Sequence, residues 1–302
     1  MPMIQFRRHR RPALPPEPQP SEWAQFTDLA AEQYGLLLRE APGAPNPPGI
    51  ETRVKLRRDL RMTWIHIKNA AGSAAMQKPQ GVYVTLDLRP EAFTGNRAKS
   101  RLVQALAGEL ADLTRLRSGD SVLVAGLGNR AVIYDALGPK TLDRLWITGH
   151  LNGKLPEALG PIRPVFALEP GVLGRTGMET GTILHAVIQQ AKPAALLAVD
   201  ALAARNRDEL GRSIQLTNTG ICPGSGILSG RAELTRESLG IPVFALGVPI
   251  LSTLAQAPDY VVTHRAVLQQ TAFFTDILAR AINLCLHPQL TEEQIAQLVE
   301  VK

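Results

Sequence analysis

The sequence predicts an α/β fold whose central sheet is mostly parallel, with helices on both faces. From residue 121 onward, short apolar runs alternate with segments of helical periodicity, which is the order of elements in a parallel sheet. The apolar runs are almost uniformly hydrophobic, as expected for strands that are covered on both faces. The predicted strands are 121–125, 165–168, 195–199, 214–216 and 243–246, and the predicted helices are 136–145, 180–190 and 271–286.

The N-terminal region predicts a leader that precedes a single α/β domain. Residues 1–25 are rich in arginine and proline, a composition that cannot form a packed element, so we expect a disordered leader. Residues 26–302 are expected to form one domain. Its first helix is predicted to run from 24 to about 39, where the Pro- and Gly-rich residues 42–49 end it.

Three segments that follow the linker predict peripheral hairpin strands, and a helix comes after them. Polar and apolar side chains alternate in 53–61 and 62–68, and residues 81–87 form a further strand-like run. These strands are expected to flank the main sheet. Leucines at helical spacing predict a helix over 98–116 that ends near a Ser-Gly pair.

The composition limits the classes of protein to which this chain can belong. With 302 residues, of which 45% are hydrophobic, it can build one large core. It has no run of about 18 apolar residues and no apolar segment behind its N-terminal arginines, so we expect a cytoplasmic protein without a membrane span or secretory signal. Cys222 and Cys285 are far apart and form no CxxC pair, which predicts reduced thiols and no structural zinc. No cofactor is expected.

The surplus of positive charge is local. The net charge is +6, and such a surplus can bind phosphate backbones or attract an acidic partner. Aromatic residues make up 5% of the chain and do not interleave with the basic ones, which argues against direct nucleic-acid binding. The two basic clusters comprise Arg7, Arg8, Arg10 and Arg11 in the leader and Arg53, Lys55, Arg57, Arg58 and Arg61 further on.

Two aspartates follow predicted buried strands. Asp135 lies in VLVAGLGNRAVIYDALGP (122–139), and Asp200 lies in LLAVDALAAR (196–205). Because the crevice of a parallel α/β sheet lies at the carboxyl ends of its strands, both carboxylates are expected to reach the same crevice. The alternative is that each carboxylate caps the helix that follows it, which is the usual role of an aspartate after a strand.

Other motifs of catalytic or binding sites are incomplete. The GLGNR run at 126–130 lacks the third glycine and the acidic residue of a dinucleotide-binding loop, so a tight turn is the better interpretation. Ser225 lies in Gly-Ser-Gly, and the serine-hydrolase pattern is absent. Cys222 is interpreted as a small residue near the site. A metal site formed by the two aspartates with His150 or His264 stays open as an alternative, although HExxH is absent.

The chain resembles the germination protease (spore protease) family from about residue 27 to its end. The resemblance depends on the segments around both aspartates and on three further motifs, PGVLGRTGMET (170–180), TGICPGSG (219–226) and LGVP (246–249). It implies an endopeptidase that hydrolyses small acid-soluble spore proteins during germination, in the spore cytoplasm. It also implies a homo-oligomer, a tetramer in this family, and a fold shared with the hydrogenase-maturation endopeptidases. Asp135 and Asp200 match the aspartates regarded as catalytic in the family.

A pair of carboxyl groups suits peptide hydrolysis. One carboxylate can take a proton from water while the other, held protonated, polarises the carbonyl or protonates the leaving nitrogen. Two close carboxylates cannot both ionise cheaply in a site of low dielectric, so a shared proton is expected. The rest of the rate enhancement must come from contacts that stabilise the oxyanion or position the substrate. The candidates for these contacts are Gly171, Gly174, Gly177, Gly224 and Ser225.

The end of the leader contains a possible self-cleavage site. Germination proteases are zymogens that shorten their own N-terminus after a threonine and an acidic residue, and FTDLA (26–30) has that form. We therefore expect cleavage between Asp28 and Leu29. The alternative is that Asp28 caps a helix that begins at Leu29. Two rival functions also stay open, a metal-engaging maturation peptidase of the same fold and a non-catalytic binding descendant.

Overall fold

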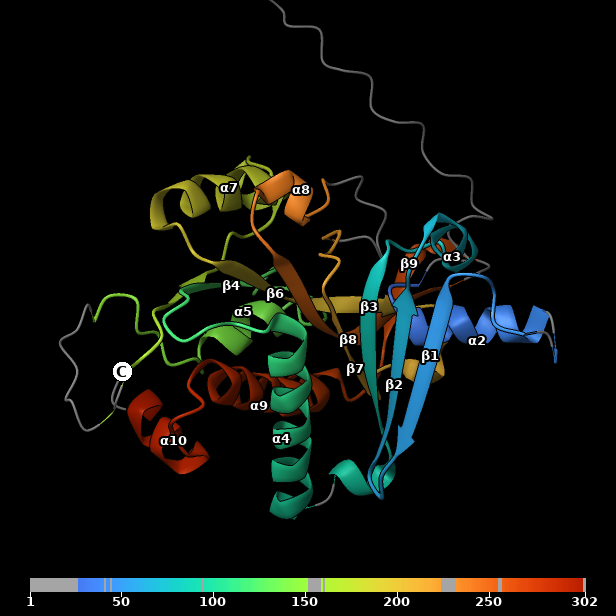
Figure 1. Cartoon of the computed structure of the whole chain (residues 1–302), viewed down its shortest axis with the longest axis horizontal. Coiled ribbons are helices and arrows are strands. Elements are labelled where there is room, and N and C mark those ends of the chain that lie inside the picture. Colours follow the sequence, from blue (N-terminus) through green and yellow to red (C-terminus); the bar gives the residue numbers. More distant parts are fainter. Residues whose placement is uncertain are drawn as a thin grey trace, which may run out of the picture.

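The chain folds around one sheet of nine strands. The structure is a computed structural model that describes residues 27–40, 42–43, 45–93, 95–151, 159, 161–223, 232–254 and 257–300. Eight strands follow the order β1-β2-β3-β7-β8-β6-β4-β5, and β9 pairs with β8 (Figure 1). The strands are β1 (Ile50–Leu56), β2 (Leu60–Ile67), β3 (Gly81–Leu88), β4 (Val122–Gly126), β5 (Val165–Leu168), β6 (Ala195–Ala204), β7 (Ser213–Thr217), β8 (Val243–Leu254) and β9 (Ala257–Thr263).

Helices lie on both faces of this sheet, as expected. Figure 1 shows α7 and α8 on one side of β4 and β6, with α5 and α9 on the other. The helices are α2 (Ala30–Glu40), α3 (Ala70–Met76), α4 (Gly95–Thr114), α5 (Leu137–Leu142), α6 (Leu173–Thr176), α7 (Thr180–Ala191), α8 (Arg236–Leu239), α9 (Val267–Leu286) and α10 (Glu292–Glu300). Two short 3-10 turns are η1 (Pro90–Phe93) and η3 (Arg207–Glu209).

The sheet is mixed, so the expectation of a mostly parallel sheet holds for only part of it. The parallel pairings are β4 with β5, β4 with β6, and β6 with β8. All other strand pairings in the described residues are antiparallel. Short links such as the turn between β1 and β2, where Arg57 N donates to Leu60 O, join strands that run in opposite directions.

The predicted hairpin strands are part of the main sheet. β3 pairs with β7, and β7 with β8, so hydrogen bonding continues from β1 to β5. The largest core cluster spans β2 to β8 on the sheet, and it joins Leu86 of β3, Val124 of β4 and Leu106 of α4 with Phe274 of α9. Smaller clusters lie under α7 and α8, and under α2 and α3.

For the other elements, the sequence predicted the type of element more accurately than its first and last residues. β5 has the predicted bounds, and β4 and β7 differ from the prediction by one residue at each end. β6 is longer than predicted, because residues 201–204, which could have formed a helix, continue the strand against β8. The short helices α3, α6 and α8, the helix α10 and the strand β9 were not predicted.

The helices of the described residues include none that is both long and apolar enough to cross a membrane. In the described residues neither cysteine forms a disulfide, and Cys222 is half-buried while Cys285 is buried.

Candidate active site

Asp200 lies in β6, and Asp135 lies in the loop that follows β4, the parallel neighbour of β6. β4 and β6 pair in register, with Gly126 opposite Val199, the residue before Asp200. The contact continues past the end of β4, where Leu127 N donates to Val199 O at 2.8 Å. The loop that leads to Asp135 therefore leaves β4 directly beside Asp200. β4 and β6 are neighbours, with which the spacing of the two aspartates is compatible, and a shared crevice for both carboxylates stays a prediction.

Helix α5 lies very close to these strand ends. A Cβ atom built on Gly138 would lie 2.4 Å from both Leu127 O and Val199 O, and one built on Gly126 would lie 2.6 Å from Gly138 O. Only glycines permit backbones to approach this closely. The start of α5, and Asp135 just before it, are thus held against the edge where β4 and β6 meet.

Asp135 is hydrogen-bonded to the first part of the loop between β4 and α5. Asn129 N donates to Asp135 Oδ2 at 2.8 Å and to the main-chain O of Asp135 at 3.0 Å. Gly128 adopts a φ of +105°, and a Cβ atom there would lie 2.2 Å from Asp135 O. Asp135 is not the N-cap residue of α5, because that position is Ala136, whose side chain makes no capping hydrogen bond. The position of Asp135 therefore does not agree with the capping alternative.

Asp200 lies inside β6 and does not begin a loop or helix. It pairs with Gly247 of β8, and it is 4% exposed. Its Oδ1 accepts a hydrogen bond from Ala201 N at 2.8 Å. Because β6 continues to Ala204, there is no helix for Asp200 to cap. Asp200 is thus fixed by a strand with partners on both sides, whereas Asp135 is fixed by its loop.

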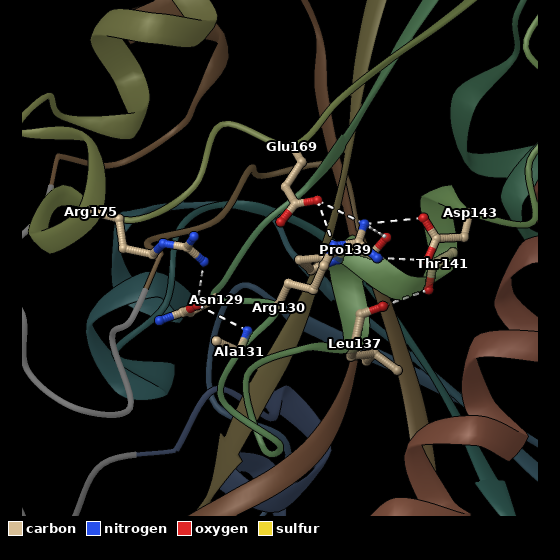
Figure 2. Close-up of polar contacts among 9 residues, drawn as sticks. All are labelled: Asn129, Arg130, Ala131, Leu137, Pro139, Thr141, Asp143, Glu169 and Arg175. Carbon is tan, nitrogen blue, oxygen red and sulfur yellow. Dashed lines mark hydrogen bonds and ion pairs between the residues drawn. The ribbon is translucent and has the colours of Figure 1, made fainter.

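Arg130 holds this loop in place, which the sequence did not predict. Figure 2 shows its guanidinium between Glu169, which follows β5, and Asp143, at the end of α5. Arg130 Nη1 donates to Asp143 Oδ2 at 2.6 Å, Nη2 donates to Glu169 Oε2 at 2.7 Å, and Nη2 also donates to Pro139 O at 3.0 Å. The two carboxylates raise the pKa of Arg130 above its usual value. Such bidentate contacts fix orientation as well as charge.

Arg175 reaches the same loop from α6. Its Nη1 donates to Asn129 Oδ1 at 3.3 Å (Figure 2), so Arg175 and Asp135 both bind Asn129. Within the described residues, the guanidinium of Arg175 has no other protein partner. Its remaining N–H groups can donate to a carboxylate of a ligand. Neither arginine has a sequence signal beyond its place in a Gly-rich motif.

The glycine candidates are only partly described. Gly171 and Gly177 have positive φ values of +73° and +70°, and Gly177 ends α6. Gly177 N already donates to Leu173 O, which leaves Gly171 and Gly174 as the candidates from this motif. Gly224 and Ser225 lie outside the described residues.

The histidines considered as metal ligands do not join the aspartates in a recognisable cluster. His264 Nδ1 accepts a hydrogen bond from Ala266 N at 3.1 Å, before α9. In the part of the chain that the structure describes, no group of three His, Cys, Asp or Glu side chains is arranged to hold a metal ion.

The predicted self-cleavage site is packed against β6. Asp28 N donates to Ala203 O at 2.9 Å, and Ala203 N donates to Asp28 Oδ2 at 2.7 Å. Gln215 of β7 donates to Asp28 O at 2.9 Å and accepts from Ala30 N at 2.7 Å. Leu29 is 2% exposed. In this conformation the Asp28–Leu29 bond is not accessible to an active site, so cleavage would require the segment to leave β6.

Comparison with known proteins identifies the family. The family model described as germination protease matches residues 44–297. A germination protease of Clostridium perfringens strain SM101 is 41% identical over 228 residues, covering 74% of this chain and 69% of that protein. One from Clostridium acetobutylicum is 38% identical over 227 residues, with the same coverage. One from Priestia megaterium is 33% identical over 288 residues, covering 91% of this chain and 78% of that protein.

Proposed function

The chain belongs to the germination protease family, and we propose that it is an endopeptidase that hydrolyses small acid-soluble spore proteins during germination. In this proposal Asp135 and Asp200 activate the attacking water and supply the proton for the leaving nitrogen. We further propose that the chain works as a homo-oligomer in the spore cytoplasm, as the family resemblance implies. No cofactor is part of the proposal.

The observation that carries this proposal is the position of the two aspartates. Asp200 lies within β6 and Asp135 lies in the loop after β4, and these two strands are adjacent and parallel. In open α/β sheets, ligands bind beyond the carboxyl ends of such strands. A water between two carboxyl groups can lose a proton to one of them while the other donates a hydrogen bond to the peptide carbonyl. The Arg130 contacts keep the Asp135 loop in one conformation, so little reorganisation is needed when substrate binds.

We also propose that the enzyme is made as a zymogen that cuts between Asp28 and Leu29. The support is the FTDLA motif at the end of the leader and its agreement with the family pattern. The packing of Leu29 suggests how premature cutting is avoided, because the bond must first detach from β6.

The decisive experiment is the replacement of each aspartate by its amide. Asp135→Asn and Asp200→Asn preserve side-chain shape but remove the proton acceptor, so each should lower the rate of proteolysis by at least about 10²-fold. The assay is digestion of a small acid-soluble spore protein, with fragments mapped by mass spectrometry.

Asp112→Asn, an exposed carboxylate on α4, is the matched control and should leave the rate unchanged. Circular dichroism should show the same fold in all three variants. If Asp135→Asn and Asp200→Asn both keep more than about a tenth of the wild-type rate, the carboxylate-pair mechanism is wrong.

A further inference from the structure

The short helix α6 carries an arginine whose positive charge is not matched by a carboxylate. Arg175 is exposed, and within the described residues its guanidinium makes one hydrogen bond, from Nη1 to Asn129 Oδ1 at 3.3 Å (Figure 2). None of the ion pairs found among those residues includes Arg175. Arg130, by comparison, is paired with both Asp143 and Glu169. Of these two arginines, Arg175 is the one that can take a negatively charged ligand.

Asn129 connects this arginine to the candidate active site. Its side-chain oxygen accepts from Arg175, and its main-chain N–H donates to Asp135 Oδ2 at 2.8 Å. The same side-chain oxygen accepts from Ala131 N at 3.1 Å, which fixes its orientation. A single residue thus separates Arg175 from a proposed catalytic carboxylate. A peptide whose scissile bond lies at the aspartates can therefore place a neighbouring side chain at Arg175.

Most of the hydrogen-bonding capacity of Arg175 is unused by the described residues. A guanidinium has five N–H donors in a planar fork that matches the two oxygens of a carboxylate. Asn129 supplies one neutral acceptor to this fork. Because a charge-assisted bidentate contact is stronger than a bond to a neutral amide, a carboxylate is the ligand that Arg175 prefers.

The surface beside Arg175 is open and partly apolar. A Cβ atom built on Gly174 or on Gly177 would have no atom of the described residues within 4 Å apart from its chain neighbours. Leu173, in α6, is 40% exposed, and Met178, just after that helix, is 52% exposed. Exposed apolar side chains around a polar group are typical of a binding surface. This segment can therefore contact the residues on either side of an acidic side chain.

We propose that Arg175 is a specificity-determining residue that binds the acidic side chain directly before the scissile bond. This inference rests on the proposed endopeptidase function. The motif FTDLA (26–30) has an acidic residue, Asp28, in that position. The guanidinium of Arg175 receives the carboxylate through paired N–H donors, while Leu173 and Met178 provide apolar contacts for the adjoining residues.

A capped peptide with the sequence of residues 24–31, AQFTDLAA, tests this assignment on the full chain. Its only acidic residue is Asp28, and a second peptide carries Asp28→Asn. The protein is the Asp200→Asn variant, which the proposed mechanism makes inactive, so the peptide stays intact during the measurement. In the protein itself Asp28 Oδ2 accepts from Ala203 N, so this carboxylate does not occupy Arg175. Fluorescence anisotropy of the labelled peptides gives the Kd of each.

The preference for the acidic peptide should depend on Arg175. With Arg175 present, the Asp28→Asn peptide should bind about fivefold to tenfold more weakly, because it lacks the charge-assisted contact. With Arg175→Gln added, the two peptides should bind alike. Arg175→Lys should keep part of the preference, since the charge remains and the bidentate contact is lost. Arg117→Gln, another exposed arginine, is the matched control and should keep all of it.

The comparison of the two peptides separates recognition from a purely structural role. If Arg175 only supported Asn129, its loss would weaken the binding of both peptides by the same factor. That result overturns the assignment, as does an equal affinity of the two peptides for protein that contains Arg175. An absence of binding of either peptide overturns it as well.

Failure of this inference is distinguishable from failure of the proposed function. A chain that does not digest a spore protein, but distinguishes the two peptides through Arg175, contradicts the proposed function and not the assignment of Arg175. Digestion of the spore protein by the wild type, without any Arg175-dependent preference between the peptides, does the reverse.

Discussion

At the scale of single residues, two arginines near Asp135 have contrasting environments. Arg130 is engaged by two carboxylates and a main-chain carbonyl, while Arg175 has one long hydrogen bond to Asn129. A fully engaged guanidinium is a structural clamp, whereas one with unused donors can bind a ligand. Arg130 is therefore a positioning residue for the Asp135 loop.

Replacing Arg130 should slow proteolysis with little change in KM. In Arg130→Gln the loop loses its ties to Asp143 and Glu169, and a displacement of about 1 Å in a reacting group can cost about 10²-fold in rate. We expect kcat to fall by roughly 10-fold to 10²-fold. Steady-state kinetics with the spore-protein substrate measures it.

Arg117→Gln is the matched control, because Arg117 is exposed and takes no part in these contacts. Arg130→Lys should restore kcat only in part, since an ammonium cannot make the bidentate contact. Equal kcat values for Arg130→Gln and Arg117→Gln would contradict the positioning role.

His287 should make the fold sensitive to mild acid. It is 0% exposed, and its ring centroid lies 4.7 Å from that of Trp146 with the ring planes tilted by 60°. Both ring nitrogens lack hydrogen-bond partners within the described residues. Burial, together with the positive charge of nearby Arg163, lowers its pKa to about 4. The unfolded chain then binds a proton between about pH 6.5 and 4 that the folded chain does not, so stability falls as the pH falls through that window.

Urea unfolding at pH 7 and pH 5 tests this sensitivity. The His287 contribution should be a loss of up to about 2 kcal/mol in the free energy of unfolding. In His287→Gln, which cannot take up a proton, the loss between these pH values should be smaller by that amount. An equal loss in wild type and variant would contradict the assignment to His287.

At the scale of elements, β6 connects the candidate site to the end of the leader. Asp200 lies in the middle of this strand, and Ala203, three residues further on, exchanges hydrogen bonds with Asp28. Gln215 of the more distant β7 holds the same segment through its side-chain amide. The segment at residues 27–30 is thus attached to the sheet by specific polar contacts.

Loosening these contacts should accelerate self-cleavage. Gln215→Ala removes the partners of Asp28 O and Ala30 N, each a buried group whose loss of a partner costs about 1–3 kcal/mol. The detached population, and with it the rate of cutting between Asp28 and Leu29, should rise about tenfold or more. Intact-mass and N-terminal sequencing over time measure the rate.

Asp28→Ala is the companion variant, and it should block the cut because the acidic residue of the motif is gone. Thr63→Ala, in β2, offers a sheet substitution without contact to the segment and should behave like wild type. Cutting at another bond, or a rate in Gln215→Ala no faster than in wild type, would count against this account.

At the scale of the whole molecule, the parallel and antiparallel halves share one core. The largest cluster joins β2 and β3 to β4, β6 and β8 through α4 and α9. A core without an internal boundary predicts that both halves unfold together. This would support one domain over residues 26–302.

The chain contains a reporter for each half. It has three tryptophans, of which Trp64 lies in β2, where its Nε1 donates to Glu109 Oε2 at 2.7 Å, and Trp146 follows α5. With Trp23→Phe in the background, Trp64→Phe and Trp146→Phe leave one reporter each. In urea, the fluorescence transition of each variant should coincide with its own transition in far-UV circular dichroism. A separate transition for either reporter would indicate two domains.

The sequence by itself determined the features that depend on local pattern. Uniformly apolar runs predicted β4, β5 and most of β6, because strands covered on both faces must be hydrophobic throughout. The same pattern associated Asp135 and Asp200 with two neighbouring strands, although Asp200 lies within its strand and not after it. The motifs around both residues indicated the family that the comparisons confirm.

Only the tertiary structure decided features that depend on distant partners. The direction of β1–β3 and their continuity with the main sheet follow from pairing with β7, and β6 extends past Asp200 because β8 lies beside it. Arg130 donates a hydrogen bond to Glu169, which lies 39 positions further along the sequence. Arg175 likewise donates to Asn129, which lies 46 positions earlier. Such contacts join residues that no local pattern relates, so they become visible only when the chain is folded.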